Sequence, residues 1–197
     1  MSRFPASRLF RCAFLLAVAA PCALQAHPGH GMDHGWGQGM LHPLTGLDHL
    51  LAMLAVGLWA AQLGGRARWV LPLGFVSVMS LGAMVGQSGV ALPGVESMIL
   101  ASVFVLGLAV ATARRAPLAV SGVLTALFAL AHGYAHGSEM AAGAARGLYT
   151  AGFLAATAVL LGLGLGAGLW AARHRHEAWL RWAGFGIAAG GFLCLAA

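Results

Sequence analysis

Histidines and carboxylates gather in two short segments of an otherwise apolar chain. One segment reads His42-Pro-Leu-Thr-Gly-Leu-Asp48-His49, and the other reads His132-Gly-Tyr-Ala-His136-Gly-Ser-Glu139. In the second segment the histidines are four positions apart and Glu139 follows three later, so a helix places all three on one face. Together the segments offer four imidazoles and two carboxylates. This sulfur-free ligand set suits Ni²⁺, Co²⁺ or Zn²⁺ better than Cu⁺ or Mg²⁺.

The first segment needs a bend before its histidines can share an ion. In a straight helix His42 and His49 would lie on one face but about 10 Å apart along the axis, too far for a common ion. We therefore expect the helix to begin after Pro43, with Gly46 allowing a bend and His42 folding back towards Asp48 and His49. A straight helix through this segment would contradict that expectation.

The composition places these ionisable groups in lipid. Of 197 residues 11 are Lys or Arg and 5 are Asp or Glu, 60% are hydrophobic and 29 are Gly, whereas a soluble domain carries roughly 25% charged residues. A water-soluble globule is excluded, and we expect an all-α membrane protein surrounded by the bilayer. Ionisable side chains are costly in hydrocarbon and mark functional sites there. The alternative for each histidine is a buried, hydrogen-bonded side chain that ties helices together.

Apolar segments of spanning length set the expected architecture. Six of them recur, at residues 44–63, 69–87, 95–113, 117–136, 148–172 and 179–197. The first, third and fifth connections carry Arg66, Arg68, Arg114, Arg115, Arg173, Arg175 and Arg181, whereas the second and fourth carry only Arg146. Because cytoplasmic loops collect basic residues, this alternation predicts six crossings with both the mature N-terminus and the C-terminus in the periplasm.

The first 41 residues are expected to be an export signal followed by a periplasmic segment. Arg3, Arg8 and Arg11 precede a short apolar run that ends in small residues at Ala26, the pattern of a cleaved signal peptide over residues 1–26. An uncleaved membrane helix is the alternative. Residues 27–41 form a His-rich segment, and residues 42–197 form the six-helix transmembrane domain.

The His-rich segment is interpreted as a weak metal-gathering tail. It carries His27, His30 and His34 among Gly and Met, a composition typical of metal binding. A flexible tail with incidental histidines is the alternative. Nucleic acid is not expected as a partner, because the Arg residues are scattered and form no basic face.

The two polar segments resemble the two signature motifs of the HupE/UreJ family of nickel/cobalt permeases. One departure is Ala131, where the family usually has Phe before the first histidine of its second motif. The resemblance implies a multi-pass protein of the bacterial inner membrane that carries Ni²⁺, with Co²⁺ or Zn²⁺ left open, to a hydrogenase, urease or cobalamin maturation system. It implies no enzymatic activity and no permanently bound cofactor, and a homo-oligomer is compatible with it. The implied ligands are His42, Asp48, His49, His132, His136 and Glu139.

Two alternatives to transport are kept. A membrane enzyme or electron carrier would hold haem or a catalytic zinc, with His49 and His132 as the axial pair of a haem. A metal sensor or chaperone would bind the ion without moving it across the membrane.

Overall fold

The computed structural model describes residues 35–113, 115–140 and 144–196, without the side chains of the last two. The predicted signal peptide over residues 1–26 lies outside the described residues. The same holds for the three histidines of the predicted tail, His27, His30 and His34.

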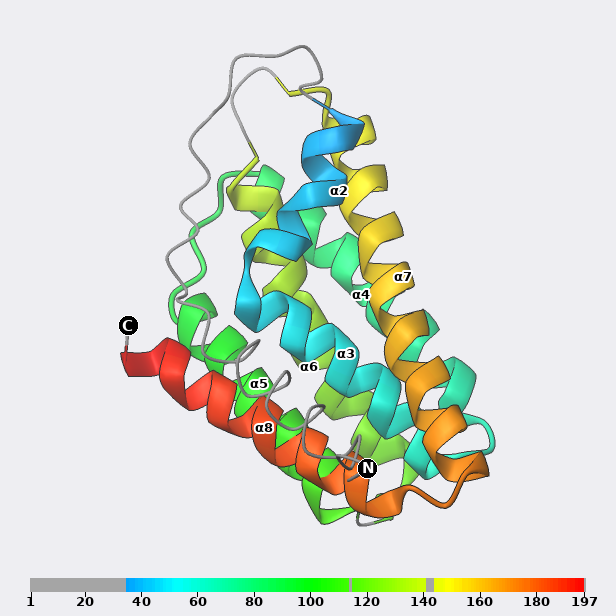
Figure 1. The fold of residues 1–197 in the computed structure, drawn as a ribbon. Coiled ribbons are helices and arrows are strands. Elements are labelled where there is room, and N and C mark those ends of the chain that lie inside the picture. Colours follow the sequence, from blue (N-terminus) through cyan, green and yellow to red (C-terminus); the bar gives the residue numbers. More distant parts are fainter. Residues whose placement is uncertain (1–34, 114, 141–143, 197) are drawn as a thin grey trace, which may run out of the picture.

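The described residues form seven α-helices and no strand (Figure 1). They are α2 (Trp36–Thr45), α3 (Leu47–Leu63), α4 (Ala67–Gln87), α5 (Val95–Thr112), α6 (Leu118–Ser138), α7 (Arg146–Arg173) and α8 (Glu177–Ala196). The all-helical prediction is confirmed, and each of the six predicted segments coincides with one of the helices α3 to α8. Helix α2 is additional.

Length and apolarity qualify several of these helices as membrane spans. Helices α4, α5, α6 and α7 pass on their own among the described residues, and the bent pair of α2 and α3 gives a fifth. Large apolar side chains also face outward on these helices, among them Leu73, Leu81, Phe104, Leu127 and Leu163. The chain is therefore compatible with a multi-pass membrane protein. Helix α8 is not among the qualifying helices, so the count of six crossings stays a prediction.

The break between α2 and α3 departs in part from the expected geometry. The two helices are bent by 84° at Gly46, so the expected bend is confirmed. The spanning helix α3 does begin after Pro43, at Leu47, but the residues before it are also helical, because α2 begins at Trp36 and runs through Pro43. Contact with α7 stabilises this short helix: a Cβ at Gly39 would lie 2.1 Å from the carbonyl oxygen of Tyr149. Packing at such close range offsets the hydrogen bond that the proline cannot donate.

Glycines bring α4 and α6 into backbone contact. An added Cβ at Gly82 or Gly86 of α4 would lie 2.3 Å from an α6 carbonyl oxygen. At Gly133 or Gly137 of α6 it would lie 2.0 or 2.2 Å from an α4 carbonyl oxygen. Both helices run in the same direction, so the contacts repeat turn by turn. Small residues allow this approach in membrane bundles, where lipid offers no hydrophobic drive for helices to associate.

Helices α3 and α7 meet in the same way. A Cβ at Gly57 would lie 2.3 Å from the Leu161 carbonyl oxygen, and one at Gly164 would lie 2.3 Å from that of Leu54. Gly162 and Gly166 have the same four-residue spacing, but no atom lies within 4 Å of a Cβ at either position. A four-residue spacing marks a helix face but does not say whether that face meets a neighbour.

The Arg-bearing turns lie at one end of the bundle. The connections after α3, α5 and α7 are all in the lower part of Figure 1, and those after α4 and α6 point the other way. Trp69, Trp170 and Trp182 are exposed near the Arg-bearing end, as expected for interfacial indoles. The side chain of Trp59, by contrast, is buried in the bundle.

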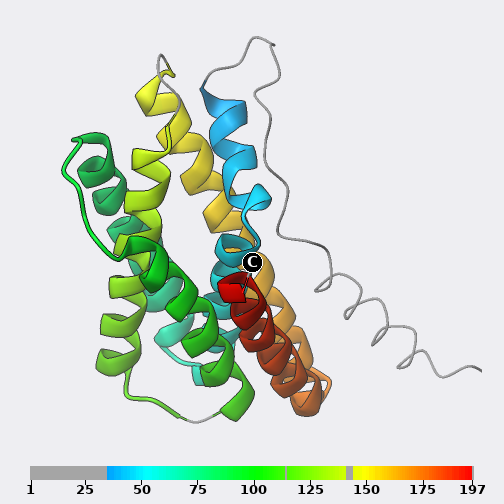
Figure 2. The same ribbon diagram turned by 90° about the vertical axis from the view of Figure 1, so that its left-hand side faces the viewer.

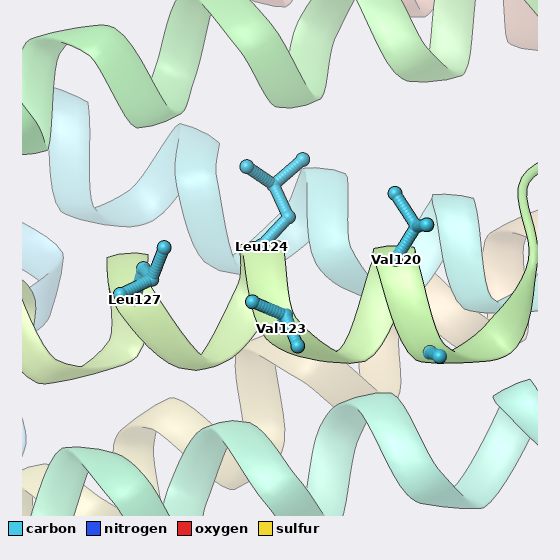
Figure 3. A pocket seen from close by; sticks show the side chains of 5 residues that line it. Val120, Val123, Leu124 and Leu127 are labelled. Atoms are coloured by element: carbon cyan, nitrogen blue, oxygen red, sulfur yellow. The ribbon is translucent and has the colours of Figure 1, made fainter.

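The outer surface of α6 carries an open apolar groove, lined by Ala119, Val120, Val123, Leu124 and Leu127 (Figure 3). These residues belong to the first half of α6, whereas the histidines of the second polar segment lie near its other end. The groove is thus separate from the predicted metal ligands. Figure 2 shows the bundle from the side, with α2 and the beginning of α7 extending at the end opposite the Arg-bearing turns.

Candidate metal site

The two polar segments meet where α2, α3 and α6 come together. Helix α2 contributes His42, the first turn of α3 contributes Asp48 and His49, and the end of α6 contributes His132 and His136. Glu139 follows immediately after α6. The structure therefore places all six sequence-predicted residues in one region, at the end of the bundle opposite the Arg-bearing turns.

Four imidazoles form a continuous series, which we call the imidazole row. The ring centroids of His42 and His136 are 4.8 Å apart, those of His136 and His49 are 4.6 Å apart, and those of His49 and His132 are 4.8 Å apart. His42 is the accessible end of the row, with 29% of its side chain exposed, whereas His136 and His132 are 1% and 0% exposed. The row thus leads from the surface into the bundle.

The accessible end of the row is held by a hydrogen bond between an imidazole and a carboxyl group. His42 Nε2 lies 2.9 Å from Glu139 Oε2, and 48% of the Glu139 side chain is exposed. The sequence placed His42 against Asp48 and His49. The structure gives it Glu139 and His136 as neighbours, because α2 continues past Pro43 and carries the ring towards the end of α6.

Asp48 orients His49. Its Oδ1 accepts hydrogen bonds from the backbone N of His49 at 2.7 Å and from the Nδ1 of His49 at 2.9 Å. An ionised carboxylate only accepts, so Nδ1 carries the proton and Nε2 presents its lone pair. Carboxylates commonly hold metal-binding histidines in this manner. A Cβ at Gly46 would lie 2.9 Å from the same Oδ1, so a glycine there leaves room for the pair.

His132 also carries its proton on Nδ1, where a backbone carbonyl group takes the place of the carboxylate. Its Nδ1 donates to the Phe128 carbonyl oxygen at 2.9 Å, which again leaves Nε2 with the lone pair. The Nε2 atoms of His49 and His132 are both buried and without a hydrogen-bond partner. Two candidate ligand nitrogens are therefore oriented by neighbours and left without a partner.

His136 lies between His42 and His49 in the row, and neither of its ring nitrogens is hydrogen-bonded. Both nitrogens are buried, and the ring stacks on Phe153 of α7 at 4.9 Å between centroids and 14° between planes. Burying a polar group without a partner is costly. Three buried imidazoles with four unpartnered nitrogens in all are the feature of this site that hydrogen bonding within the protein does not explain.

The rings are not yet arranged around one point. Among the described residues no group of three or more His, Cys, Asp or Glu side chains is placed so that it could hold a metal ion as it stands. The neighbouring rings of the row are edge to face, at 64° to 75°. Rotation of the imidazoles is therefore required before several nitrogens can reach the same ion.

Helix α7 supplies a side of the site that sequence reasoning missed. Tyr149 and Phe153, one turn apart, are buried beside the row, with the Tyr149 ring 5.9 Å from that of His42. Phe75 of α4 lies 5.9 Å from His132. Aromatic side chains are common in apolar helices, so the sequence signal was only the four-residue spacing of Tyr149 and Phe153.

Tyr134, inside the second polar segment, points away from the row and holds a loop. Its hydroxyl donates to the Val90 carbonyl oxygen at 2.8 Å and accepts from the Leu92 backbone N at 3.1 Å. The connection between α4 and α5 is thereby attached to α6 between the two histidines. Tyr134 supports the position of the site and does not face the ligands.

The geometry does not favour a haem between His49 and His132. A haem ligated by two histidines needs the rings on opposite faces of the macrocycle, but these rings are in edge-to-face contact with each other. The arrangement is better suited to a bare ion that several imidazoles approach from different helices.

Comparisons with known proteins agree with the motif resemblance. The chain matches the family described as HupE / UreJ protein over residues 14–194. It is also 46% identical over 152 residues to a curated relative, Protein HupE of Rhizobium leguminosarum bv. viciae, an alignment that covers 77% of this chain and 79% of the relative. No solved structure matches the chain.

Proposed function

This chain belongs to the HupE/UreJ family, and from that membership we propose that it is a permease carrying Ni²⁺, with Co²⁺ as a second substrate, across the bacterial inner membrane. The observation that carries the proposal is the set of three buried imidazoles, His49, His132 and His136, with ring nitrogens that lack any partner. Such groups are tolerated within a membrane protein when they bind a substrate.

The burial of the row suggests an order of events. The ion first meets Glu139 and His42, which are accessible, and exchanges part of its water for the carboxylate and the first imidazole. His136 then hands it to the Nε2 atoms of His49 and His132, which Asp48 and the Phe128 carbonyl hold in orientation. Neighbouring rings are less than 5 Å apart, so each exchange keeps at least one ligand bound.

The proposed orientation supplies a driving force. With the Arg-bearing turns in the cytoplasm, the imidazole row lies at the periplasmic end of the bundle. A membrane potential, negative inside, then favours inward movement of a divalent ion by about 4.6 kcal/mol per 100 mV for full crossing. The family resemblance extends the proposal to the destination, a metalloenzyme maturation system for hydrogenase, urease or cobalamin.

Labelled-nickel uptake tests the proposal. We expect His132→Ala to abolish saturable uptake in cells and in proteoliposomes at unchanged protein level, because it removes the most deeply buried ligand. His174→Ala is the matched control, since His174 is exposed at the Arg-bearing end and its loss should leave uptake unchanged. Wild-type uptake in His132→Ala would overturn the proposal.

A flux measurement separates transport from metal sensing. If purified protein binds Ni²⁺ but reconstituted vesicles show no saturable flux above empty vesicles under an imposed potential, the chain is a binding protein and the permease proposal is wrong. A Soret band in the purified protein would instead support the haem alternative.

A further inference from the structure

One face of α7 runs past the imidazole row and continues towards the Arg-bearing end. Tyr149, Phe153, Thr157 and Leu161 follow at four-residue intervals, and all four are buried. Phe153 stacks on His136, and the carbonyl oxygen of Leu161 lies against Gly57 of α3. Thr157 therefore lies one turn beyond the stacking contact, on the side of the row that leads into the bundle.

The hydroxyl of Thr157 differs from the other buried hydroxyls of Ser and Thr in the described part of the chain. Ser102, Ser121 and Thr125 each donate to a carbonyl oxygen of their own helix, at 2.6 to 3.2 Å. This is the usual way in which such side chains are satisfied inside a helix. Thr157 is 0% exposed, yet its Oγ1 has no partner.

Tyr149 shows the same contrast at the other end of the α7 face. Its side chain is 3% exposed and its hydroxyl has no partner, although its ring lies 5.9 Å from that of His42. The hydroxyl of Tyr134, by comparison, makes two hydrogen bonds. The two unsatisfied hydroxyls thus lie one turn before and one turn after the ring that stacks on His136.

Neither hydroxyl contributes to the stability of the fold as it stands. A buried hydroxyl without a partner is destabilising relative to an apolar group of the same shape. Phe at position 149 and Val at position 157 would fill the same space without that penalty. A bound ion that the two hydroxyl oxygens contact would explain why they lack partners in the protein. Ni²⁺ and Co²⁺ accept mixed nitrogen and oxygen ligands.

We propose that Tyr149 and Thr157 are oxygen donors of the transport site, contributed by a helix that carries neither polar segment. Tyr149 binds the partly hydrated divalent ion on the entrance side of the imidazole row, and Thr157 binds it as it leaves the row inward. The inference rests on the proposed transport function, and it assigns α7 a direct part in that function.

Hydroxyl deletion separates the two roles. For Tyr149→Phe we expect the half-saturating Ni²⁺ concentration for uptake to rise about tenfold with the maximal rate kept, because one favourable interaction is lost on binding. For Thr157→Val we expect the maximal rate to fall about tenfold, while equilibrium Ni²⁺ binding to the purified protein is retained. Thr125→Val is the matched control, since its hydroxyl is already bonded within α6.

Thermal unfolding of the same purified variants distinguishes a ligand role from a structural one. Thr157→Val should unfold at the wild-type temperature or above, because it replaces an unpartnered hydroxyl by a methyl group. A lower unfolding temperature together with lost uptake would show a structural role and overturn the inference.

The two proposals fail in different ways. If wild-type protein transports Ni²⁺ and His132→Ala does not, but both hydroxyl variants behave like Thr125→Val, the α7 inference is wrong and the permease stands. If wild-type vesicles show no saturable flux, the permease proposal fails. In that case the α7 inference is tested by Ni²⁺ titration of the purified protein. An unchanged Ni²⁺ affinity in Tyr149→Phe would overturn it.

Discussion

Gly133 links the packing of the bundle to the geometry of the candidate site, because both require that this residue has no Cβ. It lies in α6 next to His132, and an added Cβ there would be 2.0 Å from the carbonyl oxygen of Met79, 2.8 Å from its carbonyl carbon and 2.9 Å from its Cα. All three atoms belong to the α4 backbone, so no side-chain rotation can relieve the overlap. Since ordinary contact begins near 3.4 Å, Gly133→Ala must move the two helices apart by about 1.4 Å.

This displacement exceeds what a binding site tolerates. Ligand constellations need to be held within about 0.5 Å, and the movement would change the distances from His132 and His136 to His49. We expect Ni²⁺ affinity to fall by about 10- to 100-fold, the range seen when the support of a ligand is removed. Overpacking should also lower the free energy of unfolding by about 1–3 kcal/mol.

Gly122→Ala is the matched control on the same helix. No atom lies within 4 Å of a Cβ at Gly122, and alanine is favoured over glycine inside a helix by about 1 kcal/mol. The Ni²⁺ affinity, the uptake rate and the unfolding temperature of Gly122→Ala should therefore equal or exceed those of the wild type. Wild-type affinity and stability in Gly133→Ala would refute the reasoning, and so would equal losses in both variants.

Two further predictions follow from hydrogen bonds near the site. Asp48→Asn removes the charge that orients His49, so Ni²⁺ affinity measured by calorimetry should fall about 10- to 100-fold, whereas Glu96→Gln at the start of α5 should leave it unchanged; equal affinities would argue against an orienting role for Asp48. Tyr134→Phe removes two hydrogen bonds to the connection between α4 and α5, at about 1 kcal/mol each, so amide exchange at Leu92 should become faster. Unchanged exchange there would show that the loop is held by other contacts.

The helical segments were predictable because physical limits on membrane helices are narrow. Bilayer thickness sets the length of an apolar run, and glycine and proline mark where the runs end. Helix α2 was missed because its local sequence does not favour a helix. Its sequence, with Gly37, Gly39 and Pro43, has low intrinsic helix propensity, and the helix is stabilised by its contact with α7, which no local pattern reveals.

The candidate site residues could be singled out from the sequence, but their contacts with one another could not. Ionisable side chains are rare in this chain, so His42 and Glu139 stood out by type alone. Their pairing across 97 positions depends on the path of α2 and on the end of α6. Tyr149 and Thr157 carried no such signal, because a tyrosine and a threonine in a long helix are ordinary until their hydroxyls prove to be buried without partners.

The glycine contacts divide the candidate ligands between two units of closely packed helices. Helices α4 and α6 meet backbone to backbone, and so do α7 and its neighbours α2 and α3. His132 and His136 belong to the first unit, whereas His42 and His49 belong to the second. Each ring contact of the imidazole row therefore joins a histidine of one unit to a histidine of the other. A small tilt of one unit against the other would alter all of these distances together, so the imidazole row can be tightened or loosened without unfolding any helix.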